Sequence, residues 1–163
     1  MVHAMAVRLF ADKAHEQFHV AHYSLQRDHV HLIVEAQDKG VLSSGIRSVV
    51  IAFAKRLAKM VGRRRGKVWA DRYHAHVLRT PREARHALAY VLHNAKKHGV
   101  ADPRASFVDP FSSAPTFDGW SDWARGPPVA RRAASPRTWL LGVGWRRGGP
   151  LATTDAPKIQ RGR

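Results

Sequence analysis

Two histidines separated by one valine are the first residues whose spacing suggests chemistry. His29-Val30-His31 lies in a run of β-branched and aliphatic residues that is typical of a strand. Residues i and i+2 of a strand point to the same face, so His29 and His31 are placed to share one cation, while Val30 points to the core. Two unrelated surface histidines are the alternative. A second pair, His74 and His76, shows that this pattern alone is not specific.

A tyrosine and an asparagine, four residues apart, form the second candidate. Tyr90 and Asn94 lie in a segment with helical periodicity, so they stack on one side of the predicted helix, at the edge of its apolar face. Such positions can face a groove between helix and sheet. The alternative is structural: a half-buried tyrosine that anchors the helix, with Asn94 preparing its end.

Together, these residues suggest phosphodiester chemistry. A tyrosine hydroxyl can attack a DNA phosphodiester and hold the 5′-phosphate covalently, although a phenol is a poor nucleophile near neutral pH. A divalent cation would polarise the phosphate and offset the charge that develops. His29 and His31 would supply nitrogen ligands, Asn94 a side-chain oxygen, and Tyr90 the nucleophile.

The net charge indicates a polyanionic partner. The 163 residues include 28 Lys and Arg against 12 Asp and Glu, a formal charge of +16. Nucleic acid is the commonest partner of so basic a chain, and an anionic membrane is the weaker option because no helix pairs an aromatic face with a basic one. Cysteine is absent, which excludes disulfide scaffolds, Cys-ligated zinc and thiol catalysis. With neither a signal peptide nor a long apolar run in view, we expect a cytoplasmic, nucleoid-associated protein.

Several basic and aromatic residues are candidates for DNA contacts. Arginines and lysines would bind phosphates, and Trp69, like Tyr73, is available to stack on unpaired bases. A solvated charged face is the alternative for each cation. The predicted DNA-binding residues are Arg63, Arg64, Arg65, Lys67, Trp69, Arg72, Arg79, Lys96 and Lys97.

The elements that must position these residues follow from the hydrophobic periodicity. The last helix has the clearest start, with Thr80 as N-cap, Pro81 as the first helical residue and Glu83 closing a capping box, and Gly99 is its natural stop. The order predicts most of a ferredoxin-like α+β sandwich. The expected elements are a helix at 7–17, strands at 18–24 and 29–35, a helix at 43–62, a strand at 73–78 and the helix from 80.

Composition divides the chain near residue 100. Eight of the nine prolines and four of the five tryptophans lie beyond Val100. We therefore expect a catalytic domain over residues 1–100 and a Pro/Gly/Trp/Arg-rich, largely irregular extension over 101–163. In that extension the apolar residues at 139–141 and 145 would dock on the domain or on a partner.

Three segments carry a resemblance to a known family. In order and spacing, the chain has QRDHVHLIVEA, VWADRYHAHVLRTPREARHALAYVLHN and KKHG. These resemble the REP-associated tyrosine transposases, which are HUH single-strand transposases of insertion sequences, and the similarity covers roughly residues 6–100. The segment SPRTWLLGVGWRRGGP is similar to the C-terminal end of some members.

The resemblance implies a ferredoxin-like domain that binds hairpin-forming single-stranded DNA. It would cut and rejoin strands through a 5′-phosphotyrosine with Mg²⁺ or Mn²⁺. His29 and His31 match the HUH metal ligands, Tyr90 matches the nucleophile and Asn94 matches the third ligand. Members usually begin with a central strand, which residues 1–6 are too short to supply, so we expect a sheet without its first strand.

Two other functions remain open at this point. One is a nucleic-acid-binding ferredoxin-like domain without catalysis, such as a decayed transposase, which the short N-terminus favours. The other is a replication-initiator or relaxase nickase, which shares the chemistry and differs in substrate. We expect a monomer or homodimer that associates with no membrane.

Overall fold

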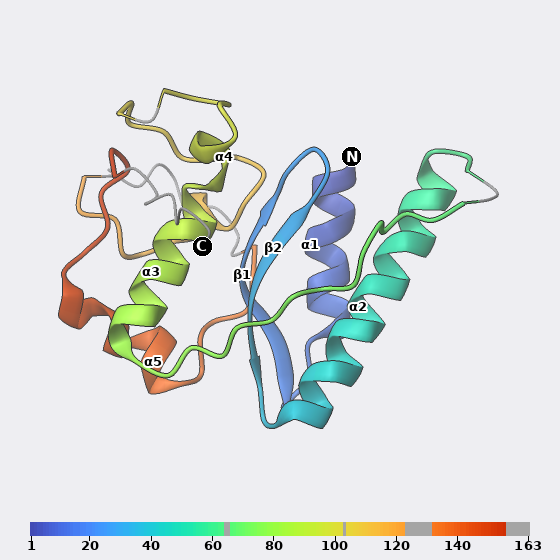
Figure 1. The fold of residues 1–163 in the computed structure, drawn as a ribbon, viewed down its shortest axis with the longest axis horizontal. Coiled ribbons are helices and arrows are strands. Elements are labelled where there is room, and N and C mark those ends of the chain that lie inside the picture. Colours follow the sequence, from blue (N-terminus) through green and yellow to red (C-terminus); the bar gives the residue numbers. More distant parts are fainter. Residues whose placement is uncertain (64–65, 103, 123–131, 156–163) are drawn as a thin grey trace.

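The computed structural model describes residues 1–63, 66–102, 104–122 and 132–155. It is an α+β fold, as predicted, in which a two-stranded hairpin separates two groups of helices (Figure 1). The main elements are α1 (Val2–Lys13), β1 (Phe18–Leu25), β2 (Val30–Ala36), α2 (Lys39–Met60) and α3 (Pro81–Leu92). Four short helices follow: α4 (Asn94–Lys97), η1 (Ala114–Thr116), α5 (Trp139–Gly142) and η2 (Gly144–Gly148).

The predicted antiparallel hairpin is confirmed. Phe18 pairs with Ala36 at one end and Leu25 with Val30 at the other, and a bulge lies between Val20 and His22. Because side chains alternate along a strand, the even residues of β2 face α1 and α2, and the odd residues face α3. The predicted histidine pair, His29 and His31, is therefore on the side of the hairpin that faces α3.

The even-numbered face packs against α1 and α2. The apolar residues of α1 recur at helical spacing, and Leu9 and Phe10 are buried against Phe18 of β1. Asp38 caps α2 by accepting a hydrogen bond from the Val41 backbone nitrogen at 2.8 Å. Gly45 of α2 lies against the Phe18 ring, and a Cβ there would overlap the ring.

The other face carries α3, which begins as predicted. Thr80 accepts from the Glu83 backbone nitrogen, Glu83 accepts from the Thr80 nitrogen, and Pro81 opens the helix. Leu88 of α3 is buried in a core that includes Ile33 of β2. This packing holds α3 across the histidine-bearing face of the hairpin.

The C-terminal segment completes that second core. Its described residues form only short helices, yet Trp145 is 1% exposed and Leu151 fully buried. The segment also covers the outer edge of β1, because Leu25 donates to the Phe111 carbonyl at 3.0 Å and Ser113 donates to the Tyr23 carbonyl at 3.0 Å. Residues beyond Val100 are thus part of the packed structure around the hairpin.

Three elements differ from expectation. The first helix spans 2–13 instead of 7–17, and α2 begins at Lys39 because Asp38 provides the cap. The strand predicted at 73–78 is wrong: residues 72–79 run between α2 and α3 without strand pairing (Figure 1). A β-prone pattern predicts an extended backbone, but a strand also needs backbone hydrogen bonds to a neighbour, and among the described residues this segment makes none to β1 or β2.

Candidate active site

The hairpin and α3 bring Tyr90 against His31. The two rings meet edge to face, with centroids 5.0 Å apart and an interplanar angle of 83°. His31 is on the odd-numbered face of β2, and Tyr90 packs partly buried at the margin of the α3 core. The two residues proposed from separate sequence patterns therefore share one site.

His29 lies at the other side of His31. Its ring centroid is 4.9 Å from that of His31 and 4.5 Å from that of His98. Its Nδ1 lies 2.7 Å from an oxygen of Asp28. If Nδ1 carries the proton and donates it to Asp28, Nε2 presents a lone pair, which is the state a metal ligand requires.

The electrostatics of the site favour neutral His31 and ionised Asp28. Burial, followed by the positive charges of His29, Lys97 and His98, lowers the pKa of His31 to about 4. The hydrogen bond from His29 holds the pKa of Asp28 below its usual range. At neutral pH the His31 imidazole is therefore uncharged and able to act as a ligand.

A lysine contacts the tyrosine oxygen. Lys97 Nζ donates a hydrogen bond to Tyr90 Oη at 2.8 Å and lies 4.6 Å from the centre of the tyrosine ring. A charged donor makes a stronger hydrogen bond than a neutral one, and the contact with the ring face adds a cation–π attraction. The phenol oxygen of α3 is thus held by the last residue of α4.

Asn94 is fully buried at the start of α4. Neither Oδ1 nor Nδ2 of its side chain has a hydrogen-bond partner. A buried amide without hydrogen-bond partners lowers the stability of the fold, and it points to a ligand that would take up its unused oxygen or nitrogen. No hydrogen bond joins Asn94 to His29 or His31.

By their chemistry, the side chains of His29, His31 and Asn94 fit a divalent ion. Imidazole nitrogens and an amide oxygen are ordinary ligands of Mn²⁺, and Mg²⁺ takes the oxygen readily and fills its other positions with water. Within the described residues, no three His, Cys, Asp or Glu side chains are grouped to hold a metal, so the set depends on Asn94. His74 and His76, the second pair, are exposed on the segment between α2 and α3.

The predicted DNA-binding residues differ in how accessible they are to DNA. Trp69 is not free to stack on a base, because its indole donates to the Val50 carbonyl at 3.0 Å and its ring packs on Phe53. Arg64 and Arg65 lie outside the described residues. The side chains that are exposed are those of Arg63, Lys67, Arg72, Arg79 and Lys97.

Lys96 has a different environment from the one expected. It is 3% exposed, and its ammonium donates to the Thr153 carbonyl and to the Asp155 carbonyl, the latter at 3.4 Å. Burial lowers its pKa. Its contacts fasten the C-terminal segment to α4, so it is not on the surface where a phosphate would be bound.

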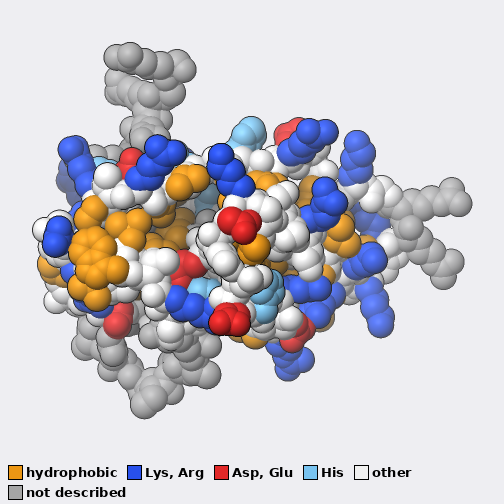
Figure 2. All heavy atoms as spheres, turned by 90° about the horizontal axis from the view of Figure 1, so that it is seen from below, with side chains coloured by type: hydrophobic (Ala, Val, Ile, Leu, Met, Phe, Trp, Pro, Cys, Tyr) orange, Lys and Arg blue, Asp and Glu red, His pale blue; other side chains and the backbone are white. Residues whose placement is uncertain are grey.

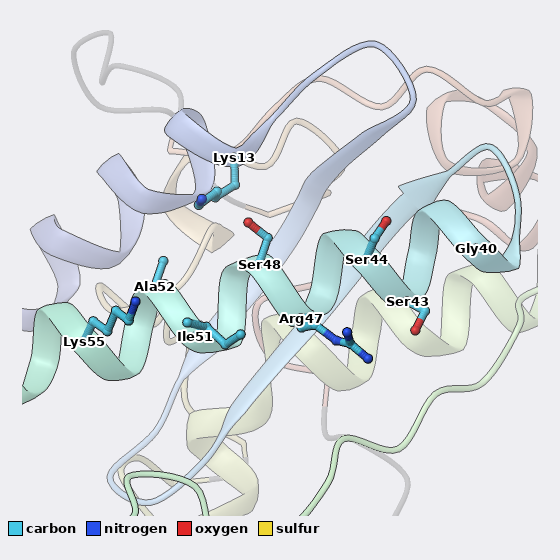
Figure 3. Close-up of a pocket in the computed structure, with 9 residues that line it drawn as sticks. All are labelled: Lys13, Gly40, Ser43, Ser44, Arg47, Ser48, Ile51, Ala52 and Lys55. Atoms are coloured by element: carbon cyan, nitrogen blue, oxygen red, sulfur yellow. The ribbon is translucent and has the colours of Figure 1, made fainter. Parts of the chain in front are cut away.

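Basic side chains also cover surfaces away from Tyr90. Figure 2 shows them spread over one face of the molecule and densest toward the end that α2 forms, while acidic groups lie among them mainly in the middle of this face. A hollow of about 710 Å³ lies along α2, where Lys13, Arg47 and Lys55 contribute cations (Figure 3). It lies with α1 and α2, on the opposite side of the hairpin from α3, and is separate from the candidate site.

Two contacts of the site were not anticipated from sequence. His98, beside His29, was not singled out, and Lys97 was assigned to phosphates without its contact to Tyr90. A signal existed, since Lys97 follows Tyr90 by seven residues, or about two helical turns, and His98 follows Asn94 by four. Gly99, with a φ of 72°, ends this helical stretch as predicted.

The sequence of the chain matches a family of proteins that act in DNA transposition. The family model described as transposase IS200-like matches residues 7–94, more than half of the chain, so the chain belongs to this family. It is a transposase, a DNA-binding and DNA-processing enzyme. Comparisons with curated proteins and with solved structures gave no match. In the part of the chain that the structure describes, no helix is long and apolar enough to cross a membrane.

Proposed function

We propose that this transposase is a metal-dependent, single-strand enzyme that cleaves and rejoins hairpin-forming DNA through a 5′-phosphotyrosine. The observation that carries the proposal is the position of the Tyr90 ring against His31, with His29 adjacent. A tyrosine beside the neutral imidazole of His31, on a strongly basic chain, is suited to attack a phosphodiester.

In the proposed reaction, Tyr90 Oη attacks the scissile phosphorus. A bond forms between Oη and phosphorus, and the bond from phosphorus to the 3′ oxygen breaks. The phenol proton passes to water and the departing 3′ oxygen takes a proton from water, so charge and atoms balance. The energy of the phosphodiester is kept in the adduct, and a 3′-hydroxyl can attack it in reverse to rejoin a strand.

His29, His31 and Asn94 would hold a divalent ion, Mg²⁺ or Mn²⁺. When bound, the ion would supply Lewis-acid polarisation of the scissile phosphate. Asp28 orients His29 through its hydrogen bond, and the low pKa of His31 keeps that imidazole available near neutral pH. The exposed cations between α2 and α3 would bind the flanking phosphates.

The test uses a pool of single-stranded oligonucleotides that carry one hairpin, randomised flanks and a label at the 3′ end. A 5′-phosphotyrosine retains the 3′ part of the strand, so the label should migrate with the protein on a denaturing gel in the presence of Mn²⁺. Tyr90→Phe should abolish this adduct while leaving DNA binding nearly intact, and EDTA should prevent it.

An adduct that persists in Tyr90→Phe would show that another residue is the nucleophile. If the unaltered protein binds the DNA but forms no adduct, the result would favour the alternative function, a DNA-binding domain without catalytic activity. Tyr73→Phe is the matched control, because Tyr73 is exposed and lies on the segment between the helices. It should form the adduct as the unaltered protein does.

A further inference from the structure

Lys97 is placed to do more than bind the DNA backbone. It is the residue whose ammonium contacts Tyr90 Oη, the oxygen that attacks in the proposed function. The contact is close, at 2.8 Å, and the lysine also covers one face of the tyrosine ring. His31 contacts the same ring edge to face. The phenol is thus held by two neighbours from different elements.

We propose that Lys97 is a catalytic residue of the strand-transfer reaction. It fixes the attacking oxygen before DNA binds, and it then stabilises the negative charge of the non-bridging phosphate oxygens as Oη bonds to phosphorus. This inference rests on the proposed function of Tyr90. An ammonium is suited to both tasks, because it is a compact charge with three donors on a flexible stem.

The position of Lys97 in the fold supports this assignment. Its neighbour Lys96 is buried and fastened to Thr153, so the backbone from which Lys97 projects is anchored. Lys97 itself is exposed, so an incoming phosphate can reach it. An anchored backbone with an exposed ammonium allows Nζ to move between Oη and a phosphate oxygen a few ångströms away.

In the reaction, Lys97 stays protonated and forms no covalent bond. It donates to Oη in the free enzyme and to a non-bridging phosphate oxygen as the bond from Oη to phosphorus forms. Charge stabilisation of this kind, by one preorganised donor, typically accounts for about 100-fold in rate. An ordinary phosphate contact far from the reacting atoms would affect binding instead.

The test compares Lys97→Met, Lys97→Arg and the control Lys39→Met. Lys39 is an exposed lysine at the start of α2, outside the candidate site, and its substitution removes the same charge. The single-turnover rate of adduct formation is measured with saturating 3′-labelled hairpin oligonucleotide and Mn²⁺. The dissociation constant for the same DNA and the melting temperature are measured alongside.

We expect Lys97→Met to slow adduct formation about 100-fold at saturating DNA, with the melting temperature unchanged. Lys97→Arg, which keeps the charge, should recover part of the rate, and Lys39→Met should react as the unaltered protein does. The affinity for DNA should fall no more in Lys97→Met than in Lys39→Met.

A normal rate in Lys97→Met at saturating DNA would overturn the proposal and leave Lys97 as a backbone contact. Equal loss of rate in Lys97→Arg and Lys97→Met would also overturn it, since the charge would then not matter. If the unaltered protein forms no adduct, the proposed function of Tyr90 fails first, and the role of Lys97 fails with it.

Discussion

The carboxylate of Glu35, on β2, accepts hydrogen bonds from both the backbone nitrogen and the side-chain hydroxyl of Thr138, in the C-terminal segment. One carboxylate oxygen accepts from the Thr138 nitrogen at 2.9 Å and from the Thr138 hydroxyl at 2.5 Å, and the other accepts from the Arg137 nitrogen at 2.7 Å. His19 Nε2 lies 2.7 Å from the same carboxylate. A buried charge on the strand that also carries His31 thus secures a segment more than 100 residues later in the chain.

Replacing Glu35 should therefore loosen the C-terminal segment. Glu35→Gln removes the charge and leaves an amide NH₂ where an acceptor is needed, which should lower the free energy of unfolding by about 1–3 kcal/mol. Chemical denaturation measures this loss, and limited proteolysis should cut the segment faster. Glu16→Gln, at an exposed position, is the control. Unchanged stability in Glu35→Gln would show that these hydrogen bonds add nothing over solvation.

The same carboxylate predicts a loss of stability in acid. Burial opposes its ionisation, but hydrogen bonds from Thr138 and Arg137 outweigh this, and the net pKa of Glu35 is below its ordinary value of 4.5. The unfolded chain then binds a proton more readily, so the stabilisation is present above pH 4.5 and is lost as the pH falls through the folded pKa. Burial lowers the pKa of His19 from 6.5, which adds a loss of the same sign beginning near pH 6.5.

Denaturation at a series of pH values tests this prediction. The difference in stability between the unaltered protein and Glu35→Gln should be largest near pH 6–7 and shrink below pH 4.5. A difference that stays constant down to pH 3 would mean that the ionisation of Glu35 is not linked to folding.

The capping box of α3 should be worth a measurable amount of stability. Thr80→Ala removes the oxygen that accepts from the Glu83 nitrogen at 3.2 Å, and the loss should be about 1 kcal/mol. Thermal or chemical denaturation measures it. Ser43→Ala, at an exposed position within α2, should change stability little. Since α3 carries Tyr90, the variant should also slow adduct formation when measured close to its melting temperature.

Asp28 should affect metal dependence if the proposed function is correct. Asp28→Asn keeps the size of the side chain but weakens the hydrogen bond that orients His29. Outer partners of metal-binding histidines typically contribute 10- to 100-fold in affinity, so the Mn²⁺ concentration for half-maximal adduct formation should rise about 10-fold or more. The maximal rate at high Mn²⁺ should change less. An unaltered Mn²⁺ requirement would argue that Asp28 does not support the ligand.

The sequence predicted those features that local patterns determine. The alternation through Val30, Leu32 and Val34 defined the two faces of β2, and the residues from Thr80 to Glu83 defined the start of α3. These two elements placed His31 on one face of a strand and Tyr90 at a helix position that can face a groove beside the sheet, and the structure shows that the two rings meet. The functional roles of both residues remain predictions.

Features that depend on distant parts of the chain were not predictable in the same way. Lys96 and Lys97 are adjacent and chemically identical, and only the packing of Thr153 determines that one is buried. Trp69 was expected to be available for bases, but its position depends on the Val50 carbonyl of α2. The segment 73–78 has a β-prone composition, yet among the described residues it makes no backbone hydrogen bonds to a strand.

The buried ammonium of Lys96 links the position of Lys97 to Thr153 and Asp155, which lie outside the candidate site. A protein shortened by a stop codon or a protease before Thr153 would lose the carbonyl oxygens that receive this charge. The turn that follows α3 would then rearrange to return the ammonium to water, and Lys97 would move with it. Removal of Thr153 and the residues that follow it would thus disturb the contact between Lys97 and Tyr90 Oη without changing any residue of the candidate site.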